Sequence, residues 1–281
     1  MQRFLVFVLF LSSSLLKAQN FTSGARSSSL SGASSTFSDV WSCQNNQAGI
    51  AFLKNAEAGV YYENRFLLKE LSGASFVFAT PVSKKSSFGF CYTTFGYSVF
   101  RQSKAGLSYA MKLSENFSAG LQLDYFTTGI QDPMNAYGKR SLVTGEAGFI
   151  ARLTSQVTVS GHLFNIVRAR LAEYNNELLP VILKAGIQYK FSEKLLLVGE
   201  AEKQTYLGPN FKGGIEYVPA KDVYLRAGAS SFPASMSFGT GVLYKGLKLD
   251  IASSWHPILG VSPQFSMSYV FSSMKKADSN P

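Results

Sequence analysis

Residues 181–191 read VILKAGIQYKF, and apolar and polar residues alternate along them. One face of an extended chain would carry Val181, Leu183, Ala185, Ile187, Tyr189 and Phe191, and the other Lys184, Gly186, Gln188 and Lys190. Because successive side chains of a β-strand point to opposite faces, this segment predicts a strand with one apolar and one polar side. Its length of about ten residues also suits a tilted strand that crosses a bilayer.

Similar runs follow one another along most of the chain. We predict about fourteen strands, at residues 56–63, 72–81, 86–98, 103–113, 117–127, 141–153, 157–164, 181–191, 195–203, 211–218, 223–230, 236–244, 247–255 and 264–271. Short turns such as 192–194 alternate with longer loops, which we expect at 129–140, 165–180 and 256–263. Bacterial outer-membrane barrels have short periplasmic turns and longer outer loops, whereas a soluble sandwich has no reason to alternate in this way. The pattern therefore predicts an all-β, transmembrane, up-and-down antiparallel barrel.

The composition agrees with a barrel in lipid. The chain has 281 residues, of which 46% are hydrophobic, 14% aromatic and only 16% charged. Beyond the N-terminus we find no apolar run of about 18 residues, the length that a membrane-spanning helix needs. A closed barrel is then the remaining way to satisfy every backbone group within a bilayer. No linker or charge block divides residues 56–271, so we expect one barrel domain there.

The N-terminus resembles a secretory signal peptide. A basic start, residues 1–3, precedes an apolar run at 4–11, and Leu16 and Ala18 occupy the −3 and −1 positions of a cleavage site. We assign residues 1–18 to this signal, and the alternative of a retained anchor helix is disfavoured by the short apolar stretch. The location expected is the outer membrane of a Gram-negative bacterium. Both termini are expected in the periplasm, with 272–281 as a polar tail there.

The polar faces of the predicted strands point into the lumen and carry both signs of charge. The lumen charge network that we predict consists of Lys184, Lys190, Glu200, Glu202, Lys212, Glu216, Arg226, Lys248 and Asp250. Further candidates for the lumen are Lys104, Lys112, Gln122, Asp124, Glu146 and Arg152. No ring of a single sign appears, as a selectivity filter would require. We therefore favour ion pairs that brace the barrel over a selective conduit.

The sequence offers no catalytic, metal or cofactor motif. His162 is expected in the lumen, and His256 follows Ser253 and Ser254, but no distinctive hydrolase motif surrounds them. Neither zinc-ligand spacing nor a phosphate-binding glycine loop at a helix start occurs. We predict no catalytic residues, no metal, no cofactor and no enzymatic activity. The two cysteines, Cys43 and Cys91, allow a disulfide in an oxidising compartment, although we favour unpaired thiols.

The net charge of +10 would suggest nucleic acid for a soluble protein, but here the cations are dispersed among turns, loops and lumen. Nucleic acid is therefore not an expected partner. Arg168 and Arg170, in a predicted outer loop, are candidates for contact with outer-membrane lipid and lipopolysaccharide phosphates, because arginine binds phosphate with two hydrogen bonds. The alternative is ordinary solvated loop charge.

The segment before the first strand, residues 19–55, does not alternate and is rich in small residues. We call it the hatch. It contains a G-A-R start, a G-A pair, a D-x-W element and an N-N-x-A-G-I ending, formed by Gly24, Ala25, Arg26, Leu30, Gly32, Ala33, Asp39, Asn45, Asn46, Ala48, Gly49 and Ile50. These motifs resemble the start of FadL-like and PorV/PorQ-like outer-membrane barrels, the latter from Bacteroidetes-type bacteria.

The resemblance implies a barrel of about fourteen strands whose N-terminal segment folds into the lumen. In PorV/PorQ-like proteins the barrel assists type IX secretion or surface attachment of proteins, and secretion-system or barrel-assembly subunits would then be partners. In FadL-like proteins hydrophobic molecules pass through the barrel. By family likeness we expect the secretion accessory first, with a FadL-like channel or a structural, assembly-partner barrel as alternatives.

Overall fold

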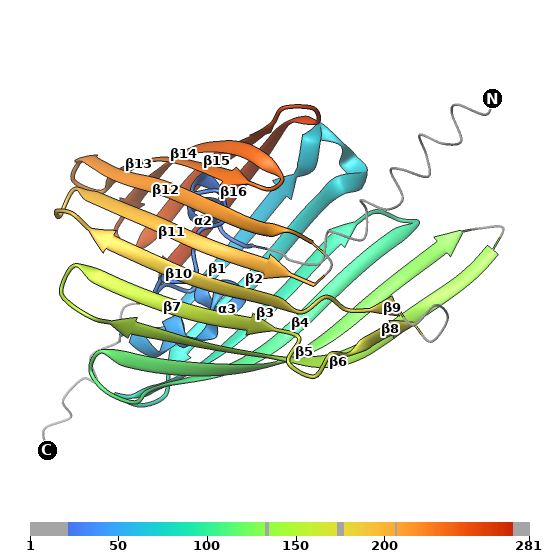
Figure 1. The fold of residues 1–281 in the computed structure, drawn as a ribbon, viewed down its shortest axis with the longest axis horizontal. Coiled ribbons are helices and arrows are strands. Elements are labelled where there is room, and N and C mark those ends of the chain that lie inside the picture. Colours follow the sequence, from blue (N-terminus) through green and yellow to red (C-terminus); the bar gives the residue numbers. More distant parts are fainter. Residues whose placement is uncertain (1–21, 133–134, 173–176, 206, 272–281) are drawn as a thin grey trace, which may run out of the picture.

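The computed structural model describes residues 22–132, 135–172, 177–205 and 207–271, with side chains omitted at 131, 132, 135–137, 170–172, 177 and 178. The barrel strands are β1 (Glu57–Asn64), β2 (Ser72–Pro81), β3 (Ser86–Gly96), β4 (Phe100–Lys112), β5 (Phe117–Asp132), β6 (Asn135–Arg152), β7 (Val157–Phe164), β10 (Ile182–Lys190), β11 (Leu195–Gln204), β12 (Pro209–Ala220), β13 (Val223–Ser231), β14 (Ala234–Tyr244), β15 (Leu247–His256) and β16 (Gly260–Val270). They form one closed antiparallel barrel, in which β1 pairs with β16 (Figure 1). The predicted fold class is confirmed.

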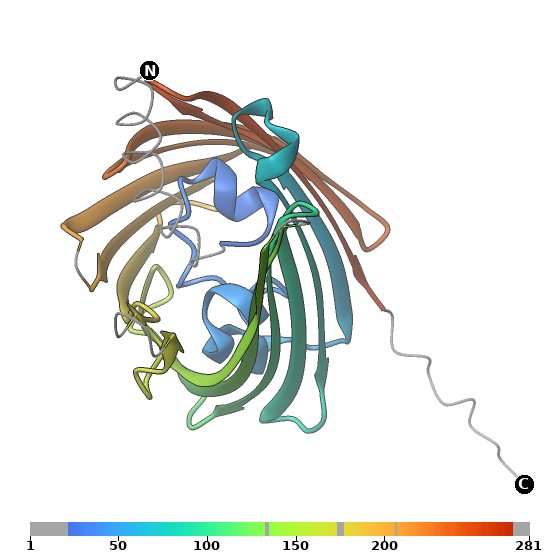
Figure 2. The ribbon, with the colours of Figure 1, turned by 90° about the vertical axis from the view of Figure 1, so that its right-hand side faces the viewer.

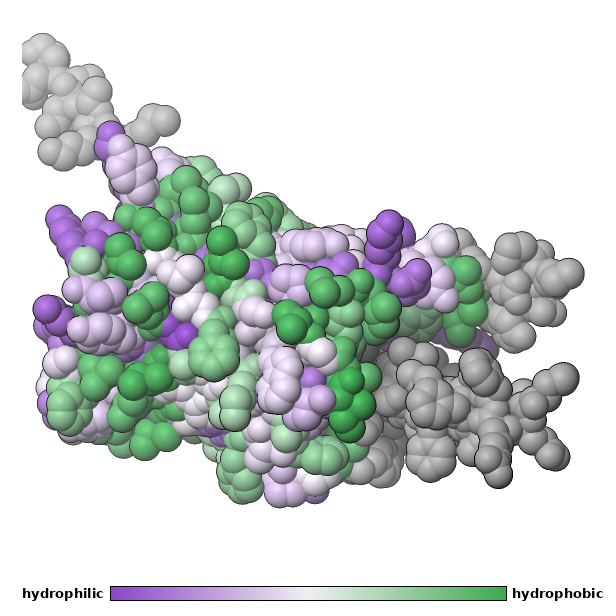
Figure 3. Space-filling view, turned by 90° about the horizontal axis from the view of Figure 1, so that it is seen from above, coloured by the Kyte–Doolittle hydropathy of each residue, from purple (hydrophilic) through white to green (hydrophobic). Residues whose placement is uncertain are grey.

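The faces of the wall follow the alternation that the sequence predicts. On β10, Leu183 and Ile187 are 53% and 52% exposed, whereas Lys184 between them is 3% exposed. Figure 3 shows hydrophobic side chains over much of this face of the molecule and the most hydrophilic ones mainly toward its two ends. Apolar outside and polar inside is the arrangement of a barrel in lipid, the reverse of a soluble protein. Within the described residues, no helix is long and apolar enough to cross a membrane.

The strands are longer than predicted at two of the connections. The expected loop at 129–140 is wrong, because β5 and β6 continue as a hairpin that pairs Gly129 with Lys139 and Ile130 with Gly138. The expected loop at 256–263 is shortened, since β16 begins at Gly260. Between β7 and β10 the chain adds a two-stranded sheet of β8 (Arg170–Ala172) and β9 (Glu177–Leu178), inside the predicted loop at 165–180.

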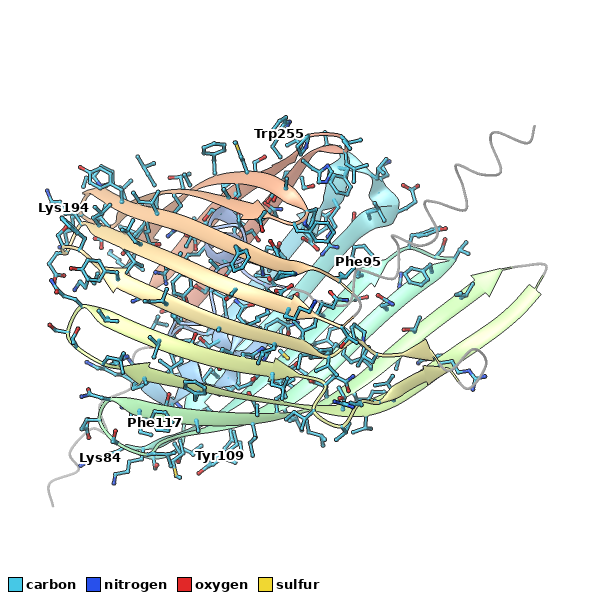
Figure 4. The ribbon with its side chains drawn as sticks, in the orientation of Figure 1. Lys84, Phe95, Tyr109, Phe117, Lys194 and Trp255 are labelled. Carbon is cyan, nitrogen blue, oxygen red and sulfur yellow. The ribbon has the colours of Figure 1, made fainter. Side chains whose placement is uncertain are left out.

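The two ends of the barrel differ. The end with the short connections, which we call the turn end, carries Lys84 and Lys194 at the left of Figure 4. The opposite, loop end carries the projecting β5–β6 hairpin and the short helices η3 (Arg65–Leu67) and η4 (Lys69–Leu71) between β1 and β2. The two longest connections, between β1 and β2 and between β7 and β10, both lie at this end, but the connections between β13 and β14 and between β15 and β16 are as short as the turns at the opposite end.

The hatch lies inside the barrel in two parts (Figure 2). The first contains α2 (Ala25–Ser29) and packs against β13–β16, whereas the second contains α3 (Ser42–Asn45) and η2 (Gln47–Phe52) and packs against β2–β6. The two parts touch where Gly24 of the first lies against the ring of Trp41 of the second. Only glycine suits this position, because its φ is +97° and a Cβ would lie 2.8 Å from the Trp41 ring. Small residues thus allow a short segment to fill a confined space.

The described chain begins and ends at opposite ends of the barrel. Thr22 lines a pocket at the loop end, whereas Phe271 donates its backbone N–H to Ala56 at the turn end, over 2.8 Å. The prediction that both termini lie in the periplasm is therefore not confirmed. The predicted signal peptide, 1–18, and the polar tail, 272–281, lie outside the described residues.

Candidate functional site: the lumen and its hatch

The hatch contacts the wall at glycines whose missing side chains leave room for it. Among the described residues, eight lumen-facing glycines on eight strands share this feature: Gly59, Gly89, Gly120, Gly148, Gly186, Gly214, Gly228 and Gly239. A Cβ at Gly214 would lie 2.7 Å from Leu30 Cδ2, and one at Gly228 would lie 2.8 Å from the Ser31 backbone nitrogen. Close-packed interiors tolerate added methyl groups poorly. Hatch and wall are therefore complementary surfaces in close contact around the lumen.

Arg26 of α2 joins the hatch to three strands through a chain of ion pairs. Its Nε and Nη2 donate to both carboxylate oxygens of Glu216 on β12, at 2.9 and 2.8 Å, and Nη1 donates to Asp39 at 3.2 Å. Glu216 also accepts from Arg226 of β13 at 2.6 Å, and Arg226 donates to Asp250 of β15 at 2.7 Å. Bidentate arginine–carboxylate pairs are strong and directional. They fix the position of α2 in the lumen.

A second group of charges holds the chain between the two parts of the hatch. Glu200 on β11 accepts the backbone N–H groups of residues 34–35, at 3.2 and 3.0 Å. Lys212 on β12 donates to Glu200 at 3.2 Å and to Glu202 at 2.6 Å, and Lys184 lies 4.0 Å from Glu202. The carboxylate of Glu200 thus accepts hydrogen bonds from hatch N–H groups that are buried away from water, and buried polar groups need such partners.

A third group centres on Glu146 of β6, which is 1% exposed. It accepts from Lys104 at 2.8 Å and lies 2.9 Å from His162 Nε2, while Lys104 is 3.9 Å from Asp124. Gln47 of the hatch donates to Glu146 at 2.5 Å. The contact between Gln47 and Glu146 could not be predicted from the sequence, because an uncharged residue inside a motif gives no signal of a partner on β6.

The predicted lumen charges otherwise lie where the alternation puts them, with one exception. Lys248 faces the lumen on β15, where its Nζ lies 5.3 Å from the centre of the Tyr224 ring. The prediction that Lys190 belongs to the lumen charge network is wrong: its side chain is 43% exposed and pairs with Glu193 at 2.6 Å across a turn. Lys190 lies on the same face of β10 as Lys184, as predicted. It is the last residue of the strand, however, and lies at the turn end, beyond the hatch.

The remaining predicted residues fall into two groups. Among the hatch motif residues, Asn45 donates to the Ser23 carbonyl at 3.0 Å, and Asn46 donates to the carbonyls of Ser35 and Phe149 at 2.7 and 3.2 Å. The motif asparagines thus tie separate hatch segments to each other and to β6. Of the two predicted lipid contacts, Arg168 is exposed near the loop end, whereas the side chain of Arg170 lies outside the described residues.

Apolar clusters also occupy the interior, and one of them packs Leu30, Ala33 and Phe37 of the hatch on Val198 of β11. Another joins hatch residues such as Trp41 and Ile50 to β2 and β3, and it contains both cysteines. Cys43 and Cys91 are free and buried, and burial raises the pKa of the Cys43 thiol well above its usual value. A third cluster contains Phe126, Phe164, Leu179 and Ile182, near the loop end.

A pocket of about 270 Å³ opens at the loop end of the lumen and ends on the hatch. Its lining from the hatch is Thr22, Ser28, Ser31 and Gly32; its lining from the wall and loops is Glu63, Arg65, Phe66, Pro233, Ser235, Ser254, Trp255, His256, Ser262 and Gln264. The pocket therefore combines aromatic surface with hydroxyl groups and one ion pair, Arg65 with Glu63 at 2.8 Å.

The histidines are engaged in structural contacts. His256 Nδ1 accepts the backbone N–H groups of Ile258 and Leu259, both at 3.2 Å. Ser253 lies on the membrane face of β15 and Ser254 on its lumen face, beside Ser262. Among the residues that the structure describes, no group of three or more histidine, cysteine, aspartate or glutamate side chains is arranged to hold a metal ion.

No protein-family model and no curated protein matches the sequence. Solved structures do match. The Ralstonia pickettii toluene transporter TbuX has a TM-score of 0.69 at 11% identity, over 90% of this chain and 100% of that chain. The Pseudomonas putida toluene transporter TodX has 0.64 at 11%, over 88% and 96%. A Pseudomonas aeruginosa FadL homologue has 0.65 at 13%, over 90% and 99%. The fold is thus that of FadL-type outer-membrane barrels.

Proposed function

We propose that this protein is a non-enzymatic outer-membrane channel for small, mainly hydrophobic molecules, closed by its hatch. The observation that carries the proposal is the loop-end pocket, because its floor is the hatch itself. A molecule that enters from the loop end meets Ser28 and Ser31 of the hatch before it reaches the rest of the lumen. Likeness in fold to two toluene transporters supports the same function. The short turns then face the periplasm and the pocket faces outward.

The size of the pocket limits the ligand. Its volume of about 270 Å³ exceeds the roughly 150 Å³ apolar cavity that accommodates benzene. It is smaller than the typical range for drug-sized ligands, about 300–1,000 Å³. A substituted benzene ring fits these limits, whereas a long acyl chain does not. The hydroxyl groups of Ser254 and Ser262 favour a ring that carries a polar substituent.

Passage requires the first part of the hatch to move. This part lies beneath the pocket and is held to the wall by the packing of Leu30, Ala33 and Phe37 on Val198 and by polar contacts: the Arg26–Glu216 pair, the Ala25 N–H to Ser266 Oγ at 3.0 Å, and the Ser31 N–H to Ser237 Oγ at 2.9 Å. Water can replace the two serine contacts, whereas the Arg26 pair and the apolar packing must break for this part to move. The second part belongs to the larger apolar cluster, with Trp41 and Ile50, and we expect it to remain in place.

The test fills the pocket with one large side chain. Ser254→Trp places an indole in the lumen, and Ser253→Trp, one residue away on the membrane face, is the matched control. We measure binding of p-cresol and toluene to the purified full chain, and toluene uptake by cells that produce it. The proposal expects Ser254→Trp to lose binding and uptake while Ser253→Trp keeps both. Unchanged binding and uptake in Ser254→Trp would contradict it.

Protein secretion or surface attachment, in the manner of PorV/PorQ-like proteins, is our second candidate. It rests on the hatch motif, and the β5–β6 hairpin that projects at the loop end offers a surface for a secreted protein (Figure 1). It ranks second because the pocket has no role in it. Recovery of secretion-system or barrel-assembly subunits with the chain from native membranes, together with ligand binding that Ser254→Trp leaves intact, would reverse this order.

A further inference from the structure

A groove of about 780 Å³ lies at the loop end of β3–β6. Its lining includes Tyr92, Ala105 and Tyr125, which share the membrane face of their strands with Leu107 and Leu123. These two leucines are 64% and 61% exposed. The groove thus indents the outer surface of the barrel, and it is separate from the pocket that ends on the hatch.

Cross-strand register arranges the residues of the groove in rows. Because directly paired residues share a face, Tyr92, Ala105, Tyr125 and Val143 form one row across β3–β6. The next row toward the loop end is Thr94, Ser103, Thr127 and Ser141. The row after that is Gly96, Arg101, Gly129 and Lys139. Along the barrel axis the wall therefore changes from apolar to hydroxyl-bearing to cationic.

The tyrosines follow this gradient. Tyr125 Oη bonds to Ser141 Oγ at 3.0 Å, and Tyr92 Oη lies 3.5 Å from Ser103 Oγ. Each ring therefore lies over the apolar row, and each hydroxyl reaches the row above it. Tyrosine takes this orientation at the boundary between acyl chains and headgroups. The hydroxyl row accordingly marks the depth of the headgroups on this side of the barrel.

The cationic row is open to an anion. Arg101 and Lys139 are exposed, and neither pairs with a carboxylate among the described side chains. They flank Gly129, so two strand spacings, about 10 Å, separate their Cα atoms. A Cβ at Gly129 would meet only Lys139 Cγ, at 4.0 Å. The glycine leaves a gap between two cations, directly above a hydroxyl row.

We propose that this groove binds a phosphorylated glycolipid of the outer leaflet. Its acyl chains would lie on Tyr92, Ala105 and Tyr125, its sugar on the hydroxyl row, and its phosphates against Arg101 and Lys139. Arginine and lysine form charge-assisted hydrogen bonds with phosphate, and two such groups in one gap give the site its selectivity. The site is an addition, on β4 and β6, to the lipid contact expected at Arg168 and Arg170. It does not rest on the channel proposal.

The first test removes the charges. Detergent-purified full chain is titrated with bisphosphorylated lipid A, and bound lipid is counted by native mass spectrometry. The double variant Arg101→Gln, Lys139→Gln is expected to bind at least about tenfold more weakly, because hydrogen bonds to charged groups belong to the strong class. The control, Lys69→Gln with Arg168→Gln, removes the same charge at the same end and is expected to stay within about twofold of the parent. Equal affinity for parent and double variant, or equal losses in both variants, would overturn the proposal.

The second test keeps the charges and fills the gap. Gly129→Phe is expected to weaken lipid A binding several-fold, whereas a surface that attracts lipid by charge alone would be unaffected. Phosphatidylglycerol is the second probe, because it carries one phosphate and no sugar. It is expected to bind more weakly than lipid A, and equal binding would exclude the glycolipid. Retained heat-modifiable migration in gels shows that each variant is folded.

Discussion

Arg26 shows how single residues position the hatch. Its guanidinium bonds to Asp39, 13 positions along the chain, and to Glu216, 190 positions away. The sequence predicts that Arg26 and Asp39 belong to one motif and that Glu216 faces the lumen. It cannot predict that they meet, because the hatch has no repeating pattern that sets its register against the wall. Only the folded lumen brings them together.

Loss of this arginine should loosen the hatch and leave the barrel intact. Arg26→Ala removes the bidentate contact, but Glu216 keeps Arg226 as a partner, so we expect a local cost of about 2 kcal/mol. Hydrogen exchange should then rise in residues 22–39 and stay unchanged in β12 and β13. The exposed Lys54→Ala serves as the control. Unchanged exchange in residues 22–39 would show that Arg26 does not hold them.

Two adjacent glycines on β12 give a matched test of the fit between hatch and wall. A Cβ at Gly214 meets Leu30 at 2.7 Å, whereas one at Gly213, on the opposite face, meets its nearest atom at 3.8 Å. Gly214→Ala should destabilise the hatch by about 1–3 kcal/mol, since overpacking costs that much, and Gly213→Ala should have little effect. Hydrogen exchange of residues 29–34 measures the difference. Equal behaviour of the two variants would contradict close packing there.

The cysteines allow a chemical test of burial. Cys43 and Cys91 are free and 0% exposed, so neither should react with a maleimide in the folded barrel. After denaturation without reductant both should react, and mass spectrometry should find two adducts on each chain. Absence of adducts under denaturing conditions would instead reveal a disulfide, the alternative that the sequence leaves open.

At the scale of elements, the strands were predictable because alternation is a local property. Residues 72–81 and 157–164 are strands with the predicted bounds. The β5–β6 hairpin was not predictable. Residues 129–140 contain Gly129, Pro133, Asn135 and Gly138, which are typical of loops, but ladder pairing on both sides of the tip extends the strands. The local preference of these residues for a loop is outweighed by the hydrogen bonds gained when a ladder that is already in register continues.

The membrane face of a strand should tolerate charge only near its ends. Leu123, in the interior of β5, is 61% exposed, and Leu113, at the turn end, is 57% exposed. Leu123→Arg should cost about 2–4 kcal/mol and Leu113→Arg about 0–1 kcal/mol, because the cost of a cation depends on its depth in the bilayer. Reversible unfolding in lipid vesicles measures both. Similar costs for the two variants would contradict the placement of this face in lipid.

For the molecule as a whole, the lumen is a packed interior with three groups of charged side chains, one joined to the hatch by ion pairs and two by hydrogen bonds. Inward-facing charges of both signs were predictable, and so was a segment inside the barrel. The contacts between them were not, since they depend on glycines that are scattered over eight strands and carry no individual signal. The consequence is a barrel whose lumen is occupied by its own N-terminal segment, with a pocket at the loop end of that segment.

Single-channel conductance in planar bilayers measures this closure directly. The intact chain should show little or no steady conductance, because the hatch occupies the lumen. A variant that lacks residues 22–52 and still migrates as a folded, heat-modifiable barrel should show large, stable openings. If this folded variant conducts no more than the intact chain, the hatch is not what closes the barrel.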